Sequence, residues 1–295
     1  MSSLVDVVVV SYNSSDELRE CVAPLAVRED ISVIVVDNNS DDASLDTVQG
    51  LPLTAIQLDE NRGFGSGCNV GWHSGSSPYV LFLNPDARFS ADGIRQLVER
   101  LEESGAGVAA PRVVDMTGET LPSLRHFPAV VSIFGQALFA HHLFRKASWA
   151  DDVIRDPEVY EREAVHEWAS GACLLFRREL LEEVGGFDEG YFLYCEEVDL
   201  CYRMRRAGHP LLYVPDVVCA HKGGASAPRT TLLPVLVQSR VRYATKWFNG
   251  FRRTAYRVGL VLNALTHVVF ARSAAARYSQ VRCVYTAVVA DGGKR

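Results

Sequence analysis

Three short apolar runs near the start of the chain, each leading directly into a polar cluster, constrain the fold more than any other feature. Val5–Val10 leads into Ser-Tyr-Asn-Ser-Ser, Ile31–Val36 into Asp-Asn-Asn-Ser, and Tyr79–Leu83 into Asn-Pro-Asp. An uninterrupted apolar run of this length is typical of a strand that is buried on both faces of a parallel sheet. Pro85 cannot continue a hydrogen-bonded ladder, so the third strand must end there.

The polar clusters at the ends of these runs predict a binding crevice. Helical patterns separate the runs, and alternation of strand and helix implies a parallel sheet whose strand ends meet at one edge. Tyr12, Asp37 and Asp86 would then line one crevice at that edge. Parallel α/β sheets bind nucleotides at this place, although the pattern does not identify the nucleotide.

The rest of the chain continues the alternation of strands and helices. A helix is expected to begin near Asp16, with Ser14 or Ser15 as its cap. Between Leu121 and Glu167, prolines and aromatic residues break the pattern, and we expect a partly mobile insertion. The fold class is therefore α/β, with a mostly parallel central sheet flanked by helices. The other expected elements are strands at Leu53–Leu58, Val108–Ala110, Trp168–Phe176 and Leu211–Val214, and helices at Ala91–Ser104 and Arg178–Val184.

Charge divides the chain into an acidic body and a basic C-terminal section. The 295 residues carry a net charge of −6, but 12 of the 30 Lys and Arg residues and only one of the 36 acidic residues, Asp291, lie from Arg229 onward. A solvated helical face could explain the basic charge alone. Long apolar runs accompany the charge in a pattern that is helical from Leu232 to Val289. We therefore favour contact with a membrane surface over binding to nucleic acid.

One apolar run in this section is too short to cross a membrane. Val258–Ala271 spans 14 residues and includes Asn263 and His267. A membrane-spanning helix needs about 20 predominantly apolar residues, so we expect this run to be interfacial or buried. The arginines that flank it are expected near lipid headgroups: Arg252, Arg253, Arg257, Arg272, Arg277 and Arg282.

Cysteine usage and absent motifs exclude several protein classes. The seven cysteines form no C-x-x-C pair, and the N-terminus lacks the basic segment and long apolar core of a secretory signal. We therefore expect reduced thiols in a cytoplasmic protein. The sequence has no G-x-x-x-x-G-K-[ST] loop and no G-x-S-x-G elbow. The glycine-rich segment Asn61–Gly71 does not fit the dinucleotide fingerprint, which argues against a nucleotide-linked oxidoreductase.

The glycines of Asn61–Gly71 call for a structural explanation of their own. Glycine has no Cβ, so these positions are expected to let the backbone approach a ligand or the sheet closely. A simple turn is the alternative interpretation.

A carboxylate cluster is the strongest candidate for catalysis. Glu196, Glu197 and Asp199 lie just before or within the first turn of a predicted helix, beside Tyr194. Negative charge is favourable at a helix N-terminus, so capping is one explanation. A carboxylate crowded by like charges and aromatic walls also has a raised proton affinity, which suits a general base. Asp199 and Arg203 are spaced as a helical ion pair and are predicted to be structural.

His221 precedes a second glycine-rich stretch. A single histidine is more often structural than a ligand. Its place before a glycine-rich loop makes contact with a metal or a phosphate an equally strong hypothesis.

Together these segments resemble the family-two inverting glycosyltransferases with the GT-A fold. The resemblance covers about residues 5–226, in the order in which the family shows its motifs. Among subgroups, the NPDA form is most similar to bacterial rhamnosyltransferases that extend cell-wall or surface polysaccharides. The matching pieces are VVVVSYNS, VVDNNSDD, ENRGFGSGCNVG, LFLNPDA, ASGACLLFRRE, GGFDEGYFLYCEEVDLCYRMRRAG and AHKGGAS.

The resemblance implies a GT-A catalytic domain at 1–228, with a nucleotide-binding half at about 1–115 and an acceptor-binding half at about 116–228. The helical region 229–295 would associate with the membrane. The resemblance also implies a nucleotide-sugar donor, dTDP- or UDP-linked, and Mg²⁺ or Mn²⁺. Asp86 matches the one surviving carboxylate of the D-x-D element and Asn84 replaces the other, so His221 is proposed as a second metal ligand. Asp37 would bind the base, with Tyr12 near it. The implied donor site comprises Ser11, Tyr12, Asn13, Asp37, Asn39, Asn61, Arg62, Gly63, Gly65, Asn69, Asn84 and Asp86.

The resemblance implies a single displacement in which a carboxylate activates the acceptor hydroxyl. The family's base falls on Glu197, where this chain has Glu instead of Asp, and Glu196 competes for the role. The expected acceptor is a polyprenyl-diphosphate-linked glycan or a polysaccharide of the cell envelope. The expected donor is dTDP-rhamnose, and the protein is expected on the inner face of the cell membrane. The implied acceptor site comprises Trp168, Gly171, Ala172 and Tyr194.

Two alternatives to this function stay open. Galactofuranosyl or N-acetylglucosaminyl transfer from a UDP-sugar is the rival within the enzyme class. A sugar-nucleotide-binding scaffold without activity is the rival outside it, although the cluster of Glu196, Glu197 and Asp199 argues for catalysis. A homodimer is compatible with the sequence.

Overall fold

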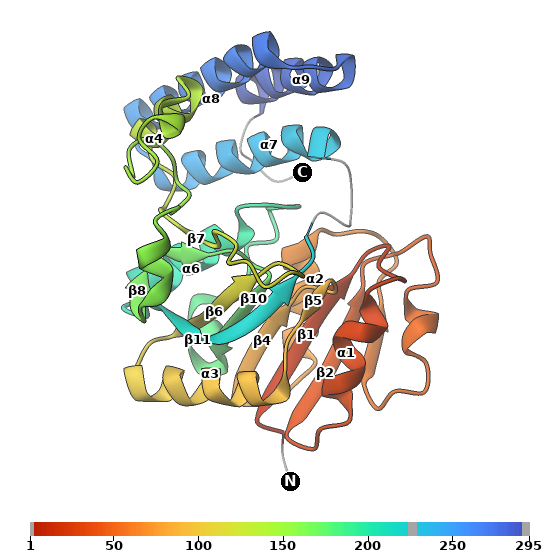
Figure 1. Ribbon diagram of the computed structural model, residues 1–295. Coiled ribbons are helices and arrows are strands. Elements are labelled where there is room, and N and C mark those ends of the chain that lie inside the picture. Colours follow the sequence, from red (N-terminus) through yellow and green to blue (C-terminus); the bar gives the residue numbers. More distant parts are fainter. Residues whose placement is uncertain (1–2, 224–228, 291–295) are drawn as a thin grey trace.

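The computed structural model describes residues 3–223 and 229–290 and consists of an α/β core beneath a layer of helices (Figure 1). In this described part the central sheet has nine strands, and β8 (Ala164–His166) pairs with β11 outside the main path. The main path runs in the order β3 (Thr54–Gln57), β2 (Ile31–Asp37), β1 (Val5–Ser11), β4 (Tyr79–Leu83), β10 (Cys173–Arg177), β6 (Val108–Val114), β11 (Leu211–His221) and β5 (Ala87–Arg88).

The three apolar runs of the sequence form the centre of this sheet, as predicted. β1 pairs in parallel with β2 on one side and with β4 on the other. All residues of β1 and β4 are buried, which explains why neither strand alternates between apolar and polar residues. Ser11 and Asp37 are register partners at the carboxyl ends of β1 and β2. The polar clusters therefore meet at one edge.

The mostly parallel sheet is confirmed, but one predicted strand is wrong. The segment Trp168–Phe176 does not form a single strand. It divides into β9 (Trp168–Ala169), which pairs with β7 (Leu124–Arg125) in a separate small sheet, and β10, which runs antiparallel to both β4 and β6. The break at 170–172 contains Gly171 and lies beside the binding cavity.

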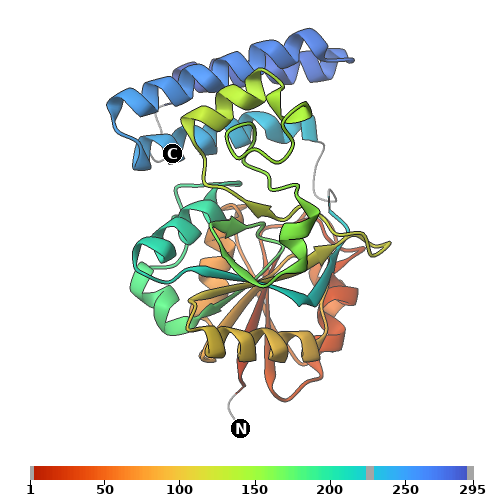
Figure 2. The ribbon, with the colours of Figure 1, turned by 60° about the vertical axis from the view of Figure 1, so that its left-hand side comes forward.

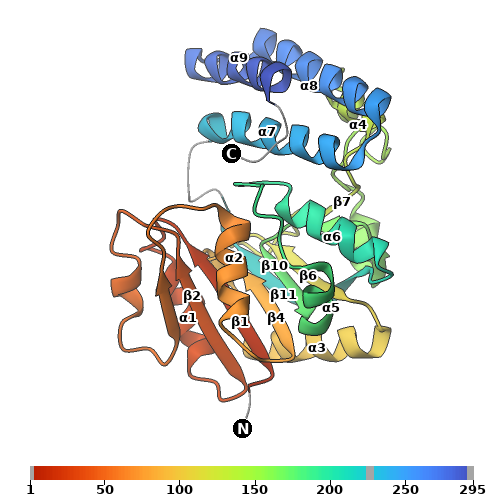
Figure 3. The ribbon, with the colours of Figure 1, turned by 180° about the vertical axis from the view of Figure 1, so that it is seen from behind.

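Helices cover both faces of the sheet (Figures 1 and 3). α1 (Leu18–Ala26) and α3 (Ala91–Ser104) pack on one face, where β1 contributes Val5, Val7 and Val9. α2 (Phe64–His73), α5 (Arg178–Val184) and α6 (Glu196–Arg206) pack on the other face, where β1 contributes Val8 and Val10. The predicted cap of α1 is wrong: its N-cap residue is Glu17, which makes no side-chain capping bond.

The glycine-rich segment forms a helix rather than a turn. α2 carries Gly67 and Gly71 on the face that packs against β1. A Cβ on Gly71 would lie 2.3 Å from Cγ1 of Val8, and one on Gly67 would lie 2.8 Å from Cγ1 of Val10. The prediction that these glycines allow close approach to the sheet is therefore confirmed, because only a residue without Cβ fits at this helix–sheet distance.

The C-terminal section forms α7 (Arg229–Trp247), α8 (Gly250–Phe270) and α9 (Ala274–Val289), and α4 (Val130–Ala137) from the 121–167 stretch joins them (Figure 2). These four helices, here called the helical layer, share a core of their own that includes Ile133, Val241 and Leu260. Short 3₁₀ helices occupy Leu45–Val48, Ala140–His142 and Pro157–Glu161. Among the described residues no helix is long and apolar enough to cross a membrane. The division of the chain at 228 remains a prediction, because that boundary lies outside the described residues.

Replacing Gly71 with Ala should destabilise the fold by about 1–3 kcal/mol, because the added methyl group overpacks the contact with Val8. Urea denaturation followed by circular dichroism measures this loss. Gly250→Ala is the matched control, since a Cβ there meets nothing within 4 Å and no change beyond about 0.5 kcal/mol is expected. Equal stabilities of the two variants would contradict the packing argument.

Candidate active site

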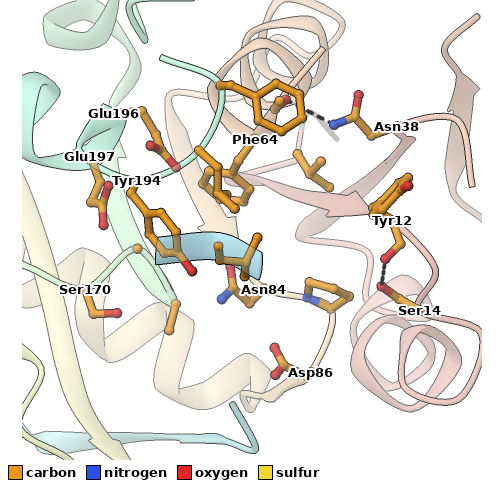
Figure 4. A pocket seen from close by; sticks show the side chains of 18 of the residues that line it. Tyr12, Ser14, Asn38, Phe64, Asn84, Asp86, Ser170, Tyr194, Glu196 and Glu197 are labelled. Carbon is orange, nitrogen blue, oxygen red and sulfur yellow. Dashed lines mark hydrogen bonds between the residues drawn. The ribbon is translucent and has the colours of Figure 1, made fainter. Parts of the chain in front are cut away.

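A cavity of about 380 Å³ opens at the carboxyl ends of β1 and β4, between the sheet and the loop that precedes α6. Figure 4 shows side chains that converge on it from the segments after β1, β2 and β4, from α2 and from the N-terminal end of α6. Eleven of the predicted site residues line this cavity: Tyr12, Asn61, Gly63, Asn84, Asp86, Gly171, Ala172, Tyr194, Glu196, Glu197 and His221.

One side of the cavity is built by the turn after β4 and the end of β11. The Nε2 atom of His221 lies 3.1 Å from Oδ1 of Asp86 and 3.3 Å from Nδ2 of Asn84. The Gly223 N–H donates to Oδ2 of Asp86 at 2.9 Å. Burial opposes ionisation of Asp86, but the hydrogen bonds from His221 and Gly223 and the attraction of His221 outweigh it and lower the pKa of Asp86. Asp86 is therefore held as a carboxylate.

The other side of the cavity carries the two glutamates. Glu196 is buried, Glu197 is half-buried, and the Oε2 atom of each has no hydrogen-bond partner among the described residues. Burial raises the pKa of both carboxyl groups, and the charge of Glu197 raises that of Glu196 further. In Figure 4 both glutamates lie on the side of Tyr194 that is opposite to Asp86. A group with a raised pKa that faces a cavity suits proton transfer.

The backbone before α6 adopts an unusual conformation that sets the direction of these glutamates. Tyr194 and Cys195 have φ values of 68° and 64°, in the left-handed region that residues with a Cβ rarely adopt. Such conformations persist only where the surrounding structure enforces them. Here α6 is anchored by the predicted pair of Asp199 and Arg203 at 2.8 Å, and also by Lys246 and Trp247 of α7.

A third side of the cavity is formed around Asn38, which the sequence analysis did not single out. The Asn38 side chain donates to Oδ1 of Asn61 and to the carbonyl of Gly63, and it accepts the N–H of Arg62. Gly63 has φ 89°, and a Cβ on it would lie 2.1 Å from the carbonyl oxygen of Phe192. Glycine is therefore required where the loops from β3 and before α6 meet.

Asp37 and several other predicted donor residues do not line the cavity. Both carboxylate oxygens of Asp37 accept hydrogen bonds from Ser40. Asn69 binds Phe187 and Glu189, and Arg62 forms an ion pair with Glu189. The structure does not bring these residues to the cavity wall, so their role in donor binding stays a prediction. The others outside the wall are Ser11, Asn13, Asn39 and Gly65, while Trp168 lines a neighbouring cavity.

The sequence analysis missed further lining residues. Ser14 was interpreted as a helix cap, and Phe64 and Ser170 lie in quoted motifs without carrying a predicted role. Proximity to the predicted residues was the only available signal for them. The complete set of missed residues is Val10, Ser14, Asn38, Phe64, Pro85, Ser170, Phe192, Leu193 and Leu232.

Comparison with known families accounts for this arrangement. The family model described as glycosyl transferase family 2 matches residues 6–185, which include β1 except its first residue, all of β4 and the Asn84–Asp86 turn. The chain belongs to glycosyl transferase family 2. It is therefore a glycosyltransferase that uses a nucleotide sugar, as the resemblance predicted, and the rival oxidoreductase and scaffold interpretations are not supported.

Relatives of this family 2 glycosyltransferase include bacterial rhamnosyltransferases. The N-acetylglucosaminyl-diphospho-decaprenol L-rhamnosyltransferase of Mycobacterium tuberculosis is 30% identical over 245 residues, which are 78% of this chain and 79% of that protein. The rhamnosyltransferase WbbL of Escherichia coli is 25% identical over 234 residues, 74% of this chain and 83% of that protein. The mannosyltransferase of Pyrobaculum calidifontis, solved with GDP-Man and Mn²⁺, has a TM-score of 0.60 at 18% identity, covers 98% of this chain and 87% of its own, and shows the shared fold.

The cavity wall of this family 2 glycosyltransferase contains residues that could bind a divalent cation. Among the described residues no group of three or more His, Cys, Asp or Glu side chains could enclose a metal. Asp86 and His221 nevertheless offer one carboxylate and one imidazole at the cavity wall. Mg²⁺ and Mn²⁺ accept such ligands and commonly take the rest from substrate phosphates and water. The two possible metal ligands, Asp86 and His221, therefore fit a cation that binds together with a diphosphate.

Replacing Glu196 with Gln should stabilise the folded protein increasingly as the pH rises. The folded pKa of Glu196 lies above its ordinary value of 4.5, so the folded state holds this proton more tightly than the unfolded state. Wild-type stability therefore falls as the pH rises from about 4.5 through the folded pKa, and glutamine does not share this loss. Thermal melts from pH 4.5 to 8 should show a difference that grows to about 3 °C or more.

Glu99→Gln is the control for that experiment, because Glu99 is exposed on α3. Its difference from wild type should stay constant across the same pH range. A constant difference for Glu196→Gln as well would contradict the assignment of a raised pKa.

Proposed function

We propose that this glycosyltransferase transfers L-rhamnose from dTDP-rhamnose to a hydroxyl group of a polyprenyl-diphosphate-linked glycan in cell-envelope synthesis. One observation carries the reaction: Asp86 with His221 and Glu197 line opposite sides of one cavity in a family 2 enzyme. The relatives in Mycobacterium tuberculosis and Escherichia coli, both rhamnosyltransferases by name, support the choice of sugar. The acceptor class is supported by the name of the mycobacterial relative.

The donor is proposed to lie along the wall from Asn38 to Asp86. Tyr12 and Asn38 are on the side of the cavity away from the glutamates, which leaves room for a nucleoside there (Figure 4). The diphosphate would then reach Asp86 and His221. A divalent cation held by these two residues would neutralise the negative charge that develops on the diphosphate leaving group.

Glu197 is proposed as the general base. It lines this cavity and also a larger cavity on the side of the helical layer. Glu197 therefore lies where a donor in the first cavity and an acceptor in the second would meet. The acceptor oxygen attacks the anomeric carbon while its proton passes to Glu197. The bond from that carbon to the diphosphate oxygen breaks, the nucleoside diphosphate leaves, and the anomeric centre is inverted. Glu196 lines the first cavity but not the second, and it is more deeply buried than Glu197. Both observations favour an electrostatic role for Glu196.

The experiment that tests this function combines purified enzyme, dTDP-rhamnose, Mn²⁺ and polyprenyl-diphosphate-linked N-acetylglucosamine. The wild-type enzyme should form a rhamnosylated lipid with an inverted anomeric centre, detected by mass spectrometry and NMR. Glu197→Gln should lower kcat by about a thousandfold, because the base is lost, while calorimetry shows unchanged binding of dTDP-rhamnose.

Glu196→Gln is the matched comparison and should retain more activity than Glu197→Gln. Full activity of Glu197→Gln would overturn the base assignment. Transfer from UDP-galactofuranose or UDP-N-acetylglucosamine, but not from dTDP-rhamnose, would overturn the proposed sugar.

The outer face of the helical layer is proposed to bind the anionic inner surface of the cell membrane. On α9, Tyr278, Val281 and Tyr285 are exposed at helical spacing, and Phe251 at the start of α8 is 84% exposed. From Arg229 to Ala290 the sequence contains no acidic residue. Aromatic and apolar side chains beside unopposed arginines are typical of a helix that lies in a membrane interface. The exposed arginines of α8, of α9 and of the turn between them are Arg252, Arg253, Arg272, Arg277 and Arg282.

Binding to lipid vesicles tests this proposal. The enzyme should sediment with vesicles that contain phosphatidylglycerol and less with pure phosphatidylcholine, and added salt should weaken the binding. The double variant Tyr278→Ser/Tyr285→Ser should bind about fivefold or more weakly, because two apolar contacts with the bilayer are lost. Val27→Ser is the control, since Val27 is 67% exposed but lies in the α/β core. Equal binding by all three proteins would exclude this face as the membrane contact.

A further inference from the structure

A second cavity, of about 740 Å³, lies between the α/β core and the helical layer and adjoins the first. Ser170, Tyr194, Glu197 and Leu232 line both cavities. The wall on the side of the core includes Arg125 and Trp168 from the small sheet of β7 and β9, and residues of α7 and α8 form the opposite wall. The second cavity therefore begins at the proposed catalytic base and extends away from the donor.

Three arginines and three carboxylates line this cavity, but not all of them form ion pairs. Arg155 is paired with Asp151, and Arg240 lies 3.2 Å from Asp152, so these charges offset one another. Arg125 is different: its guanidinium stacks 5.5 Å from the centre of the Trp168 ring. Its charge acts on Glu197 and Asp152 from a distance, but within residues 3–223 and 229–290 it has neither an ion pair nor a side-chain hydrogen bond. The guanidinium N–H groups are therefore available to an anionic ligand.

Three residues that line this cavity also carry buried polar atoms without partners in the described part of the chain. The Oε2 atom of Glu197, the Nδ1 atom of His141 and the Oδ1 atom of Asn263 are buried, and none has a hydrogen-bond partner in the described part of the chain. Each such atom costs about 1–3 kcal/mol unless a ligand or water satisfies it. Apolar side chains form another part of the lining: Leu232, Leu233, Leu236, Val237, Leu260 and Ala264. The cavity thus suits a ligand that has hydroxyl groups, an anionic group and an apolar part.

We propose that the second cavity binds the lipid-linked acceptor and that Arg125 contacts its diphosphate. This inference rests on the proposed function, because it requires an acceptor that reaches Glu197 from the side opposite to the donor. Guanidinium forms paired hydrogen bonds with phosphate oxygens, and the flat face of Trp168 holds Arg125 in place without neutralising its charge. The predicted acceptor residue Trp168 therefore acts as a platform, and Arg125 determines specificity for an anionic acceptor.

The test compares Arg125→Gln with wild type on two acceptors that carry the same saccharide. One is the polyprenyl-diphosphate-linked form and the other is a neutral octyl glycoside. The variant should raise KM for the diphosphate acceptor by about tenfold or more, because a charge-assisted contact is lost. KM for the donor and kcat/KM for the octyl glycoside should stay within about twofold.

Two further variants make the test independent of folding. Arg125→Lys keeps the charge but not the paired geometry and should give a KM between those of wild type and Arg125→Gln. Arg100→Gln removes an arginine on α3 that pairs with Glu163, and it should leave KM for both acceptors unchanged. An equal loss of activity on both acceptors, or an unchanged KM for the diphosphate acceptor, would overturn the proposal.

Calorimetry without transfer distinguishes this site from the proposed function. With dTDP present to fill the first cavity, farnesyl diphosphate should bind the wild-type enzyme and bind Arg125→Gln about tenfold or more weakly. Inorganic pyrophosphate and farnesol should each bind more weakly than farnesyl diphosphate. If pyrophosphate binds as tightly as farnesyl diphosphate, the site recognises free diphosphate, and the proposal of a lipid-linked ligand is overturned. If farnesyl diphosphate binds through Arg125 but no sugar is transferred, the function fails and the anion site stands.

Discussion

The fully buried carboxylate of Asp199 connects the catalytic core to the helical layer. It accepts hydrogen bonds from Arg203 of its own helix at 2.8 Å and from Lys246 and Trp247 of α7 at 2.9 and 2.8 Å. Two cations offset its charge, which a carboxylate with zero exposure requires. Removal of this group would take away the acceptor that Arg203, Lys246 and Trp247 share and would weaken the contact between α6 and α7. Both cavities depend on that contact, because α6 carries Glu197 and α7 carries Leu232.

The contrast between Asp199 and its neighbours separates structural from catalytic carboxylates. Asp199 lies two and three residues beyond Glu197 and Glu196, and all three belong to the first turn of α6. Asp199 is surrounded by donors, whereas each glutamate has an oxygen without a partner in the described structure. Glu196 and Glu197 therefore lower the stability of the fold at neutral pH. Enzymes commonly retain such a cost where a proton must be taken up during the reaction.

The helical layer gives the proposed reaction a direction. The donor side of the site belongs to the sheet, with Asn38 and Asp86 at strand ends, and the acceptor side opens toward α7 and α8. In the same layer, α8 and α9 expose aromatic and basic side chains. A lipid-linked acceptor would thus meet Glu197 from the side of the membrane while the nucleotide sugar arrives from solvent. Arg125 lines the cavity on the acceptor side, where it would bind the diphosphate of the acceptor under the proposal above.

The sequence by itself determined local features, namely the central strands and the motifs at their ends. The runs Val5–Val10, Ile31–Val36 and Tyr79–Leu83 could be identified as central strands because strands buried on both faces contain little besides apolar residues. Asp86 was singled out because it follows one of three buried strands that end in polar clusters, and Glu197 because it lies among three carboxylates at the start of a helix. The family could be identified because its motifs occur in their usual order over about residues 5–226.

Only the tertiary structure decided which polar groups share a cavity. Asp37 and Asn38 are adjacent in sequence, yet the first binds Ser40 and the second lines the cavity, because neighbouring residues at a strand end point in different directions. The strand predicted at Trp168–Phe176 breaks at 170–172, since its two parts join different sheets. Arg125 could not be recognised at all. Its unpaired charge depends on which carboxylates the folded chain brings near, and that is a property of distance in space rather than of position in the sequence.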